Sequence, residues 1–444
     1  MLDTIASVGN ILKEIRETNN LSLQDVTRLT QINYTLLSRI ETGKRLPTKE
    51  QIKRLAVFYK YDEKELITHL ISDKIIYEIE NEEFGIEAMQ LAERKIQYGQ
   101  SLFPEYEIQD RIKLESRRYI GNKAKLTNWI MSIIENKTEN VESFIDIFAG
   151  TAIVSQSALK KYNKVIVNDL LYSNNIIYKA FFEKGDWDKK KLEDFIHKYN
   201  FINSEPLKDN YFSENFGNKF FEQNIAKKIG YIREDIENEK QNLTEKEFSV
   251  LLASLIYNMD KVANTVGHFD AYIKKPIRKR QFQLKLIEIN EFDNIEIFRE
   301  DANTLSKKIK ADIAYIDPPY NSRQYSRFYH IYETLIKWDK PKLFGVALKP
   351  EPENMSKYCT VKAKDSFKEL VNNLDVKYLA VSYNNTYKSK SKSSENKIKL
   401  EEIKEILNEV GETTIFEQSY KAFNTGKTDF SDHKEFLFLT KKYE

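Results

Sequence analysis

The sequence has little of what disulfides, metal centres and membrane spans require. Its single cysteine, Cys359, excludes intrachain disulfides and zinc sites built from several cysteines. The five histidines are scattered without the spacing of metal ligands, so we expect no metal site. No apolar run approaches the roughly 18 residues that cross a membrane, and the first residues carry no signal-peptide pattern. These absences predict a cytoplasmic protein without a membrane partner.

A large excess of charge of one sign is also lacking. The 70 Lys and Arg residues nearly cancel the 68 Asp and Glu residues, so any nucleic-acid interface has to come from local clusters. A length of 444 residues predicts two or three domains, and 41% hydrophobic residues are enough for packed cores.

The chain divides into three stretches of different pattern. Residues 1–72 predict a compact helical unit, in which Ser22 and Asn33 are the expected N-caps of two short helices and Asp25 completes a capping box with Ser22. Residues 73–114 are charged and predict a helical connector. Residues 115–444 alternate strands and helices, which predicts an α/β domain. Six strands are expected, at residues 143–147, 164–167, 295–298, 313–316, 378–382 and 435–440.

Residues 21–43 place two short helices around a tight turn, as a helix-turn-helix requires. They resemble the Cro/repressor-type DNA-binding domains, although Gln31 stands where that family usually has a glycine; a positive φ there would cost about 1 kcal/mol. The resemblance implies that the second helix enters the major groove of DNA. A helical bundle used for dimerisation is the alternative. The implied DNA-binding residues are Asn33, Tyr34, Thr35, Ser38 and Arg39 for base edges, and Lys44 and Arg45 for phosphates.

Two strand ends in the α/β domain suit a nucleoside-like ligand. The strand at residues 143–147 leads into a turn of small residues around Gly150, where a ligand can approach the backbone at a helix N-terminus. Asp169 follows the next strand, 169 − 150 = 19 positions after Gly150, close to the spacing of a ribose-binding acid. Only one glycine of the dinucleotide fingerprint is present and no P-loop lysine. These features disfavour NAD and ATP and favour an adenosyl cofactor without phosphates.

A rigid turn, Asp317-Pro318-Pro319-Tyr320, follows the apolar strand at residues 313–316. The two prolines fix φ and hold the residues before them extended. The turn therefore presents a carboxylate, bare carbonyls and an aromatic ring in fixed relation. This arrangement suits a flat heterocycle that carries an amino group.

The order of these motifs, from the Tyr119–Lys123 segment through the 148–150 loop, Asn168-Asp169 and Glu300-Asp301 to the Asp317 turn, resembles the Dam-type DNA adenine-N6 methyltransferases. The resemblance covers about residues 115–442 and implies a Rossmann-like fold that binds S-adenosylmethionine, with an inserted target-recognition region at residues 185–290. The implied cofactor-binding residues are Tyr119, Lys123, Asp146, Phe148, Gly150, Asp169 and Asp301.

The same resemblance implies that Asp317, Pro318 and Tyr320 act on an adenine extruded from duplex DNA. By the same resemblance, an aspartate at the first position of the turn favours adenine N6 over cytosine N4, because the cytosine-N4 enzymes more often carry serine there. We therefore expect a site-specific DNA adenine methyltransferase of a restriction–modification system, whose helix-turn-helix either regulates transcription or aids methylation. A transcriptional regulator with a non-catalytic methyltransferase-like domain and an RNA methyltransferase are the alternatives. The recognition sequence, the oligomeric state and the existence of a partner endonuclease stay open.

Further DNA contacts are expected from two basic segments of the α/β domain. Such segments bind phosphate backbones, although a solvated positive face is a competing interpretation. The residues concerned are His268, Arg278 and Arg280 in the insertion, and Arg323 and Arg327 after the turn.

Overall fold

The computed structural model describes residues 6–80, 82, 84–97, 111–277, 280–386, 395–419 and 433–443. The chain forms two compact units, Met1–Glu107 and Ile108–Glu444. None of the helices in the described part of the chain is long and apolar enough to cross a membrane.

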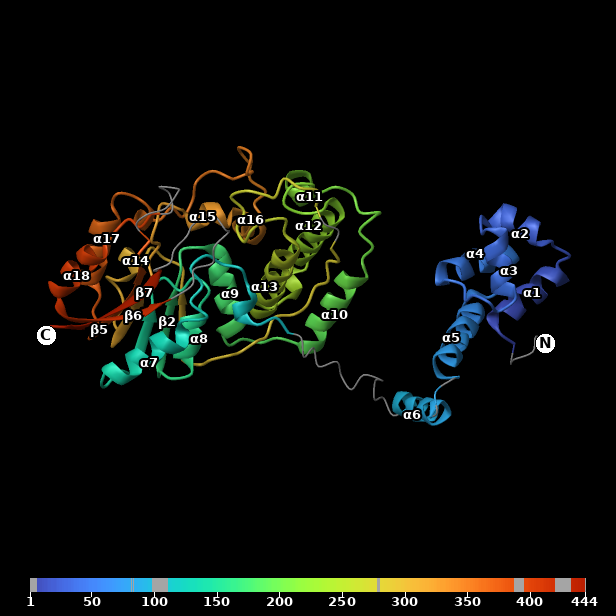
Figure 1. Cartoon of the computed structure of the whole chain (residues 1–444), viewed down its shortest axis with the longest axis horizontal. Coiled ribbons are helices and arrows are strands. Elements are labelled where there is room, and N and C mark those ends of the chain that lie inside the picture. Colours follow the sequence, from blue (N-terminus) through green and yellow to red (C-terminus); the bar gives the residue numbers. More distant parts are fainter. Residues whose placement is uncertain are drawn as a thin grey trace. The chain divides into compact units, whose positions relative to one another are not determined.

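The described residues of the first unit form helices and connecting turns, which pack around their own apolar core. Val8, Leu12, Val26, Leu37 and Leu55 are buried together in this core. The helices, drawn in blue in Figure 1, are α1 (Val8–Thr18), α2 (Leu23–Thr30), α3 (Tyr34–Glu41), α4 (Lys49–Tyr59), α5 (Glu63–Ile79) and α6 (Gly85–Gln97).

The predicted caps of the helix-turn-helix are confirmed. The Ser22 side chain accepts from the Asp25 amide and the Asp25 side chain accepts from the Ser22 amide, so the capping box at the start of α2 is complete. The Asn33 side chain caps α3 by accepting from the amide of Thr35. Gln31 ends α2 in the left-handed conformation, with φ 59°. The expected strain at this turn is therefore present.

The second unit is built on a seven-stranded sheet with the order β3-β2-β1-β4-β5-β7-β6. The first five strands in this order run parallel, whereas β7 is antiparallel to both β5 and β6. The strands are β1 (Ser143–Asp146), β2 (Lys164–Asn168), β3 (Ile295–Phe298), β4 (Ile313–Ile316), β5 (Tyr378–Asn384), β6 (Gly411–Ser419) and β7 (Lys434–Lys442). The mixed α/β architecture agrees with the predicted Rossmann-like methyltransferase fold.

Six of these strands were predicted, and β6 was missed. Its buried and exposed positions follow no sustained apolar alternation, and among the described strands it lies at the edge of the sheet and pairs only with β7. The hydrogen bonds to β7 hold β6 in the sheet, and the sequence of β6 alone does not predict them.

Helices cover both faces of the sheet (Figure 1). One apolar core contains Ile130 of α7, Ala158 of α8 and Phe181 of α9, and the other contains Phe367 of α17 and Ile403 of α18. The helices of the second unit are α7 (Thr127–Lys137), α8 (Ile153–Leu159), α9 (Tyr172–Phe182), α10 (Lys189–Phe201), α11 (Tyr211–Phe216), α12 (Gln223–Asn238), α13 (Glu245–Val262), α14 (Ala302–Leu305), α15 (Tyr325–Phe328), α16 (His330–Lys337), α17 (Ala363–Asn373) and α18 (Leu400–Asn408).

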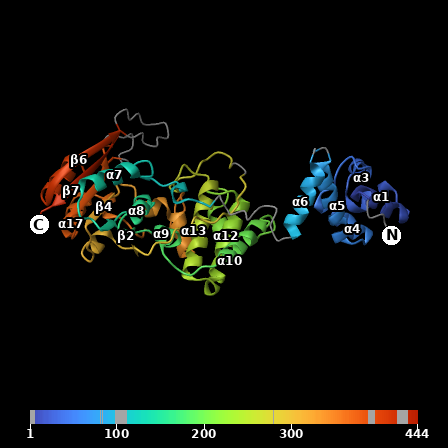
Figure 2. The same ribbon diagram turned by 90° about the horizontal axis from the view of Figure 1, so that it is seen from below.

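The inserted region at residues 185–290 contains α10 to α13, which group together in Figures 1 and 2. Leu251, Leu255 and Met259 of α13 are buried in the same core as Phe181 of α9. Because the insertion shares this core with the sheet, it is a continuous part of the second unit.

Candidate active site

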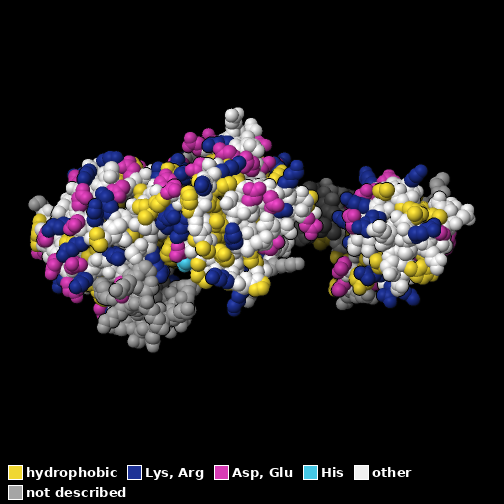
Figure 3. Space-filling view, turned by 90° about the horizontal axis from the view of Figure 1, so that it is seen from above, with side chains coloured by type: hydrophobic (Ala, Val, Ile, Leu, Met, Phe, Trp, Pro, Cys, Tyr) yellow, Lys and Arg dark blue, Asp and Glu magenta, His cyan; other side chains and the backbone are white. Residues whose placement is uncertain are grey.

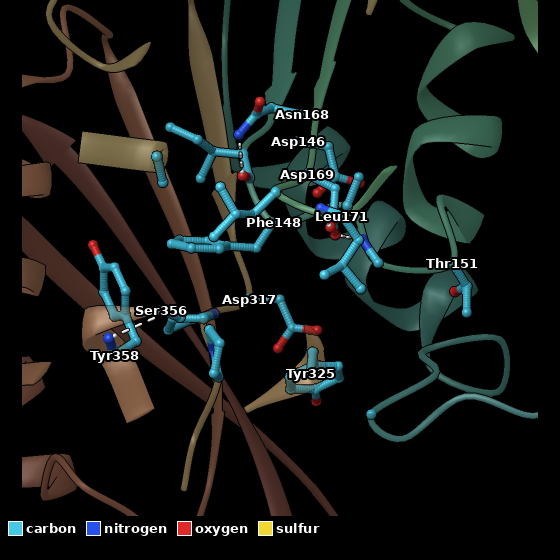
Figure 4. Close-up of a pocket in the computed structure, with 18 of the residues that line it drawn as sticks. Asp146, Phe148, Thr151, Asn168, Asp169, Leu171, Asp317, Tyr325, Ser356 and Tyr358 are labelled. Atoms are coloured by element: carbon cyan, nitrogen blue, oxygen red, sulfur yellow. Dashed lines mark hydrogen bonds between the residues drawn. The ribbon is translucent and has the colours of Figure 1, made fainter. Parts of the chain in front are cut away.

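A pocket opens at the carboxyl ends of β1, β2 and β4, where open α/β sheets bind their ligands. The 148–150 loop after β1, Asp169 after β2 and the Asp317 turn after β4 all line it. In Figure 4 the carboxyl groups of Asp169 and Asp317 lie on the same cavity as the ring of Phe148. Residues that are far apart in the sequence therefore meet at one site.

The Asp317 carboxylate is held by two side chains. The Tyr320 hydroxyl donates to its Oδ1 atom, and the Lys123 Nζ atom lies 3.0 Å from its Oδ2 atom. The Tyr320 ring lies 4.5 Å from the ring of Tyr383, and the Lys123 ammonium lies 5.0 Å from the Tyr320 ring. The turn thus presents a carboxylate of fixed orientation that is 16% exposed to the cavity.

Asp169 is fixed by backbone donors. Its Oδ2 atom accepts from the Gly150 amide at 3.0 Å and its Oδ1 atom accepts from the Leu171 amide at 2.9 Å. Gly150 has φ +52°, and a Cβ atom there would lie 3.3 Å from the Tyr119 ring. The loop after β1 and the acid after β2 are therefore tied together, and glycine keeps the approach to the Tyr119 ring open.

Asp146 is the most buried acid of the pocket, at 1% exposure. Its Oδ2 atom accepts from the Ser155 hydroxyl at 2.6 Å, whereas its Oδ1 atom has no hydrogen-bond partner among the described residues. Burial raises the pKa of Asp146 to about 7, with smaller contributions from Asp317 and Asp169. An unpartnered buried oxygen in a ligand pocket suits a donor group on the ligand.

The segment before α7 brings Tyr119 and Lys123 to the pocket. The Tyr119 ring stacks on Tyr329 at 4.6 Å and lies beneath the Arg117 guanidinium at 4.6 Å, while its hydroxyl accepts from Asn174. These contacts fix the ring beside Gly150. Lys123 is directed to Asp317, so it links this segment to the Asp317 turn.

Phe148 and Asp301 complete the predicted cofactor set. The Phe148 ring packs edge-on against Tyr358 at 4.9 Å. Asp301 is the N-cap of α14, and its Oδ1 atom accepts from the Thr304 amide at 3.1 Å. The cap occupies one carboxylate oxygen of Asp301, a residue that also lines the pocket.

The predicted DNA-binding residues of the first unit gather around α3. Most are exposed and Ser38 is half-buried, while the Asn33 side chain is engaged in capping α3. The set is Asn33, Tyr34, Thr35, Ser38, Arg39, Lys44 and Arg45.

The predicted DNA-binding residues of the second unit differ in their surroundings. His268 is half-buried and stacks on Phe328 at 4.7 Å. Arg327 is half-buried and donates to the Pro350 carbonyl, and the Arg323 guanidinium lies 5.7 Å from the Phe328 ring. Arg280 is exposed and donates to the Lys261 carbonyl. Arg278 lies outside the described residues.

Sequence reasoning missed several residues that line the pocket. Tyr325 lies between Arg323 and Arg327, in a segment expected to cover the extruded base or to contact DNA, and no motif marked Ser356, Tyr358 or Asn384. Glu435 offered one weak signal, because it is a charged residue at the start of an otherwise apolar strand. The missed lining residues include Tyr325, Ser356, Tyr358, Asn384 and Glu435.

Known proteins resemble this chain over most of the residues that form the pocket. The family described as D12 class N6 adenine-specific DNA methyltransferase matches residues 119–389, which contain the 148–150 loop, Asp169 and the Asp317 turn. The chain belongs to this family. A helix-turn-helix domain matches residues 7–68. The family makes the chain an adenine DNA methyltransferase, and methyltransferases of this kind use S-adenosylmethionine as methyl donor; the interpretation as a non-catalytic regulator is not favoured.

Individual proteins that are similar in sequence are named methyltransferases or modification methylases. The chain is 32% identical over 350 residues to type II methyltransferase M.FokI of Planomicrobium okeanokoites, a match that covers 73% of this chain and 52% of the relative. It is 30% identical over 341 residues to type II methyltransferase M.NlaIII of Neisseria lactamica, with 73% of this chain and 99% of the relative covered. The chain thus spans about half the length of M.FokI and nearly all of M.NlaIII. Modification methylase StsI of Streptococcus sanguinis is 34% identical over 286 residues, which cover 60% of this chain and 44% of that protein.

Proposed function

We propose that this protein transfers the methyl group of S-adenosylmethionine to adenine N6 at a specific sequence of duplex DNA. The observation that carries the proposal is the meeting of the Asp317 turn, the 148–150 loop and the Tyr119–Lys123 segment on one cavity. Family membership supplies the reaction class, and these residues supply the site.

The pocket fits the cofactor on the chemistry of its donor and acceptor groups. The unpartnered buried Oδ1 atom of Asp146 and the carboxylate of Asp169 suit the ammonium and ribose hydroxyl groups of S-adenosylmethionine. Phe148, Tyr119 and Gly150 would flank it, and Asp301 would face the adenine amine. When bound, this cofactor supplies an electrophilic methyl group on a sulfonium.

The chain's own residues would orient the nucleophile. The lone pair of adenine N6 is delocalised into the ring, so N6 needs acceptors for its two N–H groups. The Asp317 carboxylate and the Pro318 carbonyl are these acceptors, and a hydrogen bond to a charged group contributes about 1.5–3 kcal/mol. Most of the remaining acceleration would come from positioning the two reactants in line.

Tyr320 would serve as the stacking surface for the extruded base. Stacking on an aromatic ring contributes roughly 1–3 kcal/mol, which offsets the few kcal/mol that removing a base from the duplex costs. The Tyr320 hydroxyl also orients Asp317, so the turn would hold the base and its acceptor together.

DNA would be held by the α3 surface of the first unit and by the insertion and post-turn segments of the second. Figure 3 shows basic and acidic side chains interspersed on the displayed face, so contacts to phosphates would come from small clusters. Arg280 is the exposed candidate in the insertion. Arg323, Arg327 and His268 are half-buried against their own unit, so we expect them to shape the site beside the base.

The relatives named type II methyltransferases support placement in a cytoplasmic restriction–modification system with a partner endonuclease. For the first unit, two roles fit the helix-turn-helix. It would either repress transcription from the gene's own promoter or strengthen binding at the methylation site.

Methyl transfer from labelled S-adenosylmethionine to duplex DNA and to RNA tests the proposal, followed by modification-sensitive sequencing of DNA from cells that express the protein. We expect N6-methyladenine at one short sequence. Label confined to RNA, or methylation of cytosine N4, would contradict the proposal.

A further inference from the structure

Glu435 is a buried carboxylate in the pocket that lies outside the residues matched by the methyltransferase family. It stands near the amino end of β7, opposite Asn384 of β5 and Gln418 of β6. Because β7 runs antiparallel to β5, its amino end lies at the edge of the sheet where the parallel strands end. Only this reversal brings Glu435 to the pocket that Asp317 lines.

Glu435 is 5% exposed, and its Oε2 atom has no hydrogen-bond partner in the described part of the chain. Burial raises the pKa of Glu435, the Lys123 ammonium lowers it, and the Asp317 carboxylate raises it. Its charged neighbours are therefore the two members of the ion pair at the centre of the site. A buried carboxylate oxygen without a partner is costly unless a donor reaches it at some stage of function.

The Lys123 ammonium contacts the Asp317 carboxylate and also acts electrostatically on the Glu435 carboxylate, which lines the same pocket. Its Nζ atom contacts Asp317 at 3.0 Å, and its side chain is 7% exposed. In this arrangement both oxygens of Asp317 are engaged, one by Lys123 and one by the Tyr320 hydroxyl. If Asp317 accepts an N–H group of adenine, as the proposed function requires, the ammonium competes with the base for the Oδ2 atom.

We infer that Glu435 is a positioning residue, which accepts the Lys123 ammonium from Asp317 when the target adenine enters the pocket. The transfer frees the Asp317 Oδ2 atom for adenine N6 and keeps the buried ammonium paired. Lysine can make this movement because its ammonium group lies at the end of a flexible chain of single bonds. The inference rests on the proposed function and adds a residue from β7 to its machinery.

A double-mutant cycle with Glu435→Gln and Lys123→Met tests the inference in the full-length protein. Glu435→Gln keeps the shape of the side chain and removes its charge. We expect it to slow single-turnover methyl transfer about tenfold, because the Lys123 ammonium then lacks the carboxylate that would receive it. The same substitution should have no further effect in the Lys123→Met background. The matched control is Glu417→Gln on β6, an exposed carboxylate that pairs with Lys434 and should leave the rate unchanged.

Extrusion of the target base can be measured even in variants that no longer transfer the methyl group. A duplex with 2-aminopurine beside the target adenine brightens when the adenine leaves the stack, and S-adenosylhomocysteine prevents turnover. We expect Glu435→Gln to reduce the extruded population in the wild-type background and to have no effect beside Lys123→Met.

The results of these experiments distinguish a failure of the proposed function from a failure of the role of Glu435. Wild-type protein that methylates no DNA adenine overturns the proposed function. Active wild-type protein whose rate and base extrusion are unaffected by Glu435→Gln overturns the role of Glu435 alone. Equal losses from Glu435→Gln with and without Lys123 also overturn it, because they indicate a packing role that does not act through the ammonium.

Discussion

At the scale of single residues, Asp317 has the clearest expected effect on activity. Replacing Asp317 with alanine removes the acceptor that the N6 amino group requires but leaves the 148–150 loop and Asp169 intact. We expect methyl transfer to fall by about 100-fold or more, the size of effect seen when one polar group that stabilises a transition state is lost. Binding of S-adenosylmethionine, measured by calorimetry, should survive. Near-normal methylation by Asp317→Ala would contradict the mechanism.

Asp146 should make stability depend on pH. Burial raises its pKa from the usual range to about 7, so the folded protein binds this proton more tightly than the unfolded chain. Its contribution to stability is therefore complete below about pH 4 and is lost as the pH rises through about 7. Asp146→Asn cannot ionise, and its amide oxygen can still accept from Ser155. We expect the variant to gain roughly 2–4 kcal/mol relative to wild type between about pH 4 and pH 8, at roughly 1.4 kcal/mol per pKa unit.

Chemical denaturation at several pH values measures this difference, and Asp312 provides a control of opposite sign. Burial would raise the pKa of Asp312, but hydrogen bonds from Lys377, Ser143 and backbone amides outweigh burial and hold the pKa well below its usual value. Its contribution is present above the unfolded pKa and is lost as the pH falls through the folded value. Asp312→Asn should therefore be destabilised at neutral pH and approach wild type in strong acid. A pH-independent difference for Asp146→Asn would contradict the assignment.

At the scale of elements, the turn of the helix-turn-helix carries backbone strain. Gln31 has φ 59°, a conformation that a glycine adopts without the clash of a Cβ atom. We expect Gln31→Gly to stabilise α2 and α3 against local opening by up to about 1 kcal/mol, measured by amide hydrogen exchange. The matched control is Gln24→Gly inside α2, where the same substitution should destabilise by a similar amount. Slower exchange in the control, or faster exchange in Gln31→Gly, would show that the strain is relieved elsewhere.

The sequence predicts those helices and strands whose pattern is contained in their own residues. The capping box of α2 and the apolar runs of β1, β2 and β4 are local patterns, and the structure has them where they were expected. The edge strand β6 has no such pattern, because its stability comes from β7. The direction of β7 is likewise a property of pairing with β5, which no local pattern contains.

At the scale of the whole molecule, the pocket residues all belong to the second unit. This unit has its own apolar cores, and the first unit packs around another. Removing residues 1–107 should therefore leave the single-turnover methylation rate at saturating DNA within about twofold of wild type, because the residues that line the pocket and the cores behind them belong to the second unit. The apparent affinity for DNA then distinguishes the two roles of the helix-turn-helix. Unchanged affinity with lost promoter binding supports regulation, and a large loss of affinity supports a role in methylation.

The truncated protein can also contradict the independence of the second unit. Loss of methylation at saturating DNA, with the fold of the second unit intact by circular dichroism, would show that the first unit takes part in catalysis.

The sequence by itself determined that a helical DNA-binding part precedes an α/β part, the reaction class and the motifs around Gly150, Asp169 and Asp317. These are short stretches in which a few adjacent residues set backbone conformation and chemistry. Only the tertiary structure decided that Lys123 lies against Asp317, that Asp301 caps α14, that His268 and Arg327 pack into their own unit, and that Glu435 reaches the pocket. Each of these follows from long-range pairing and burial, which depend on residues distant in the chain and leave no periodic or local pattern in the sequence.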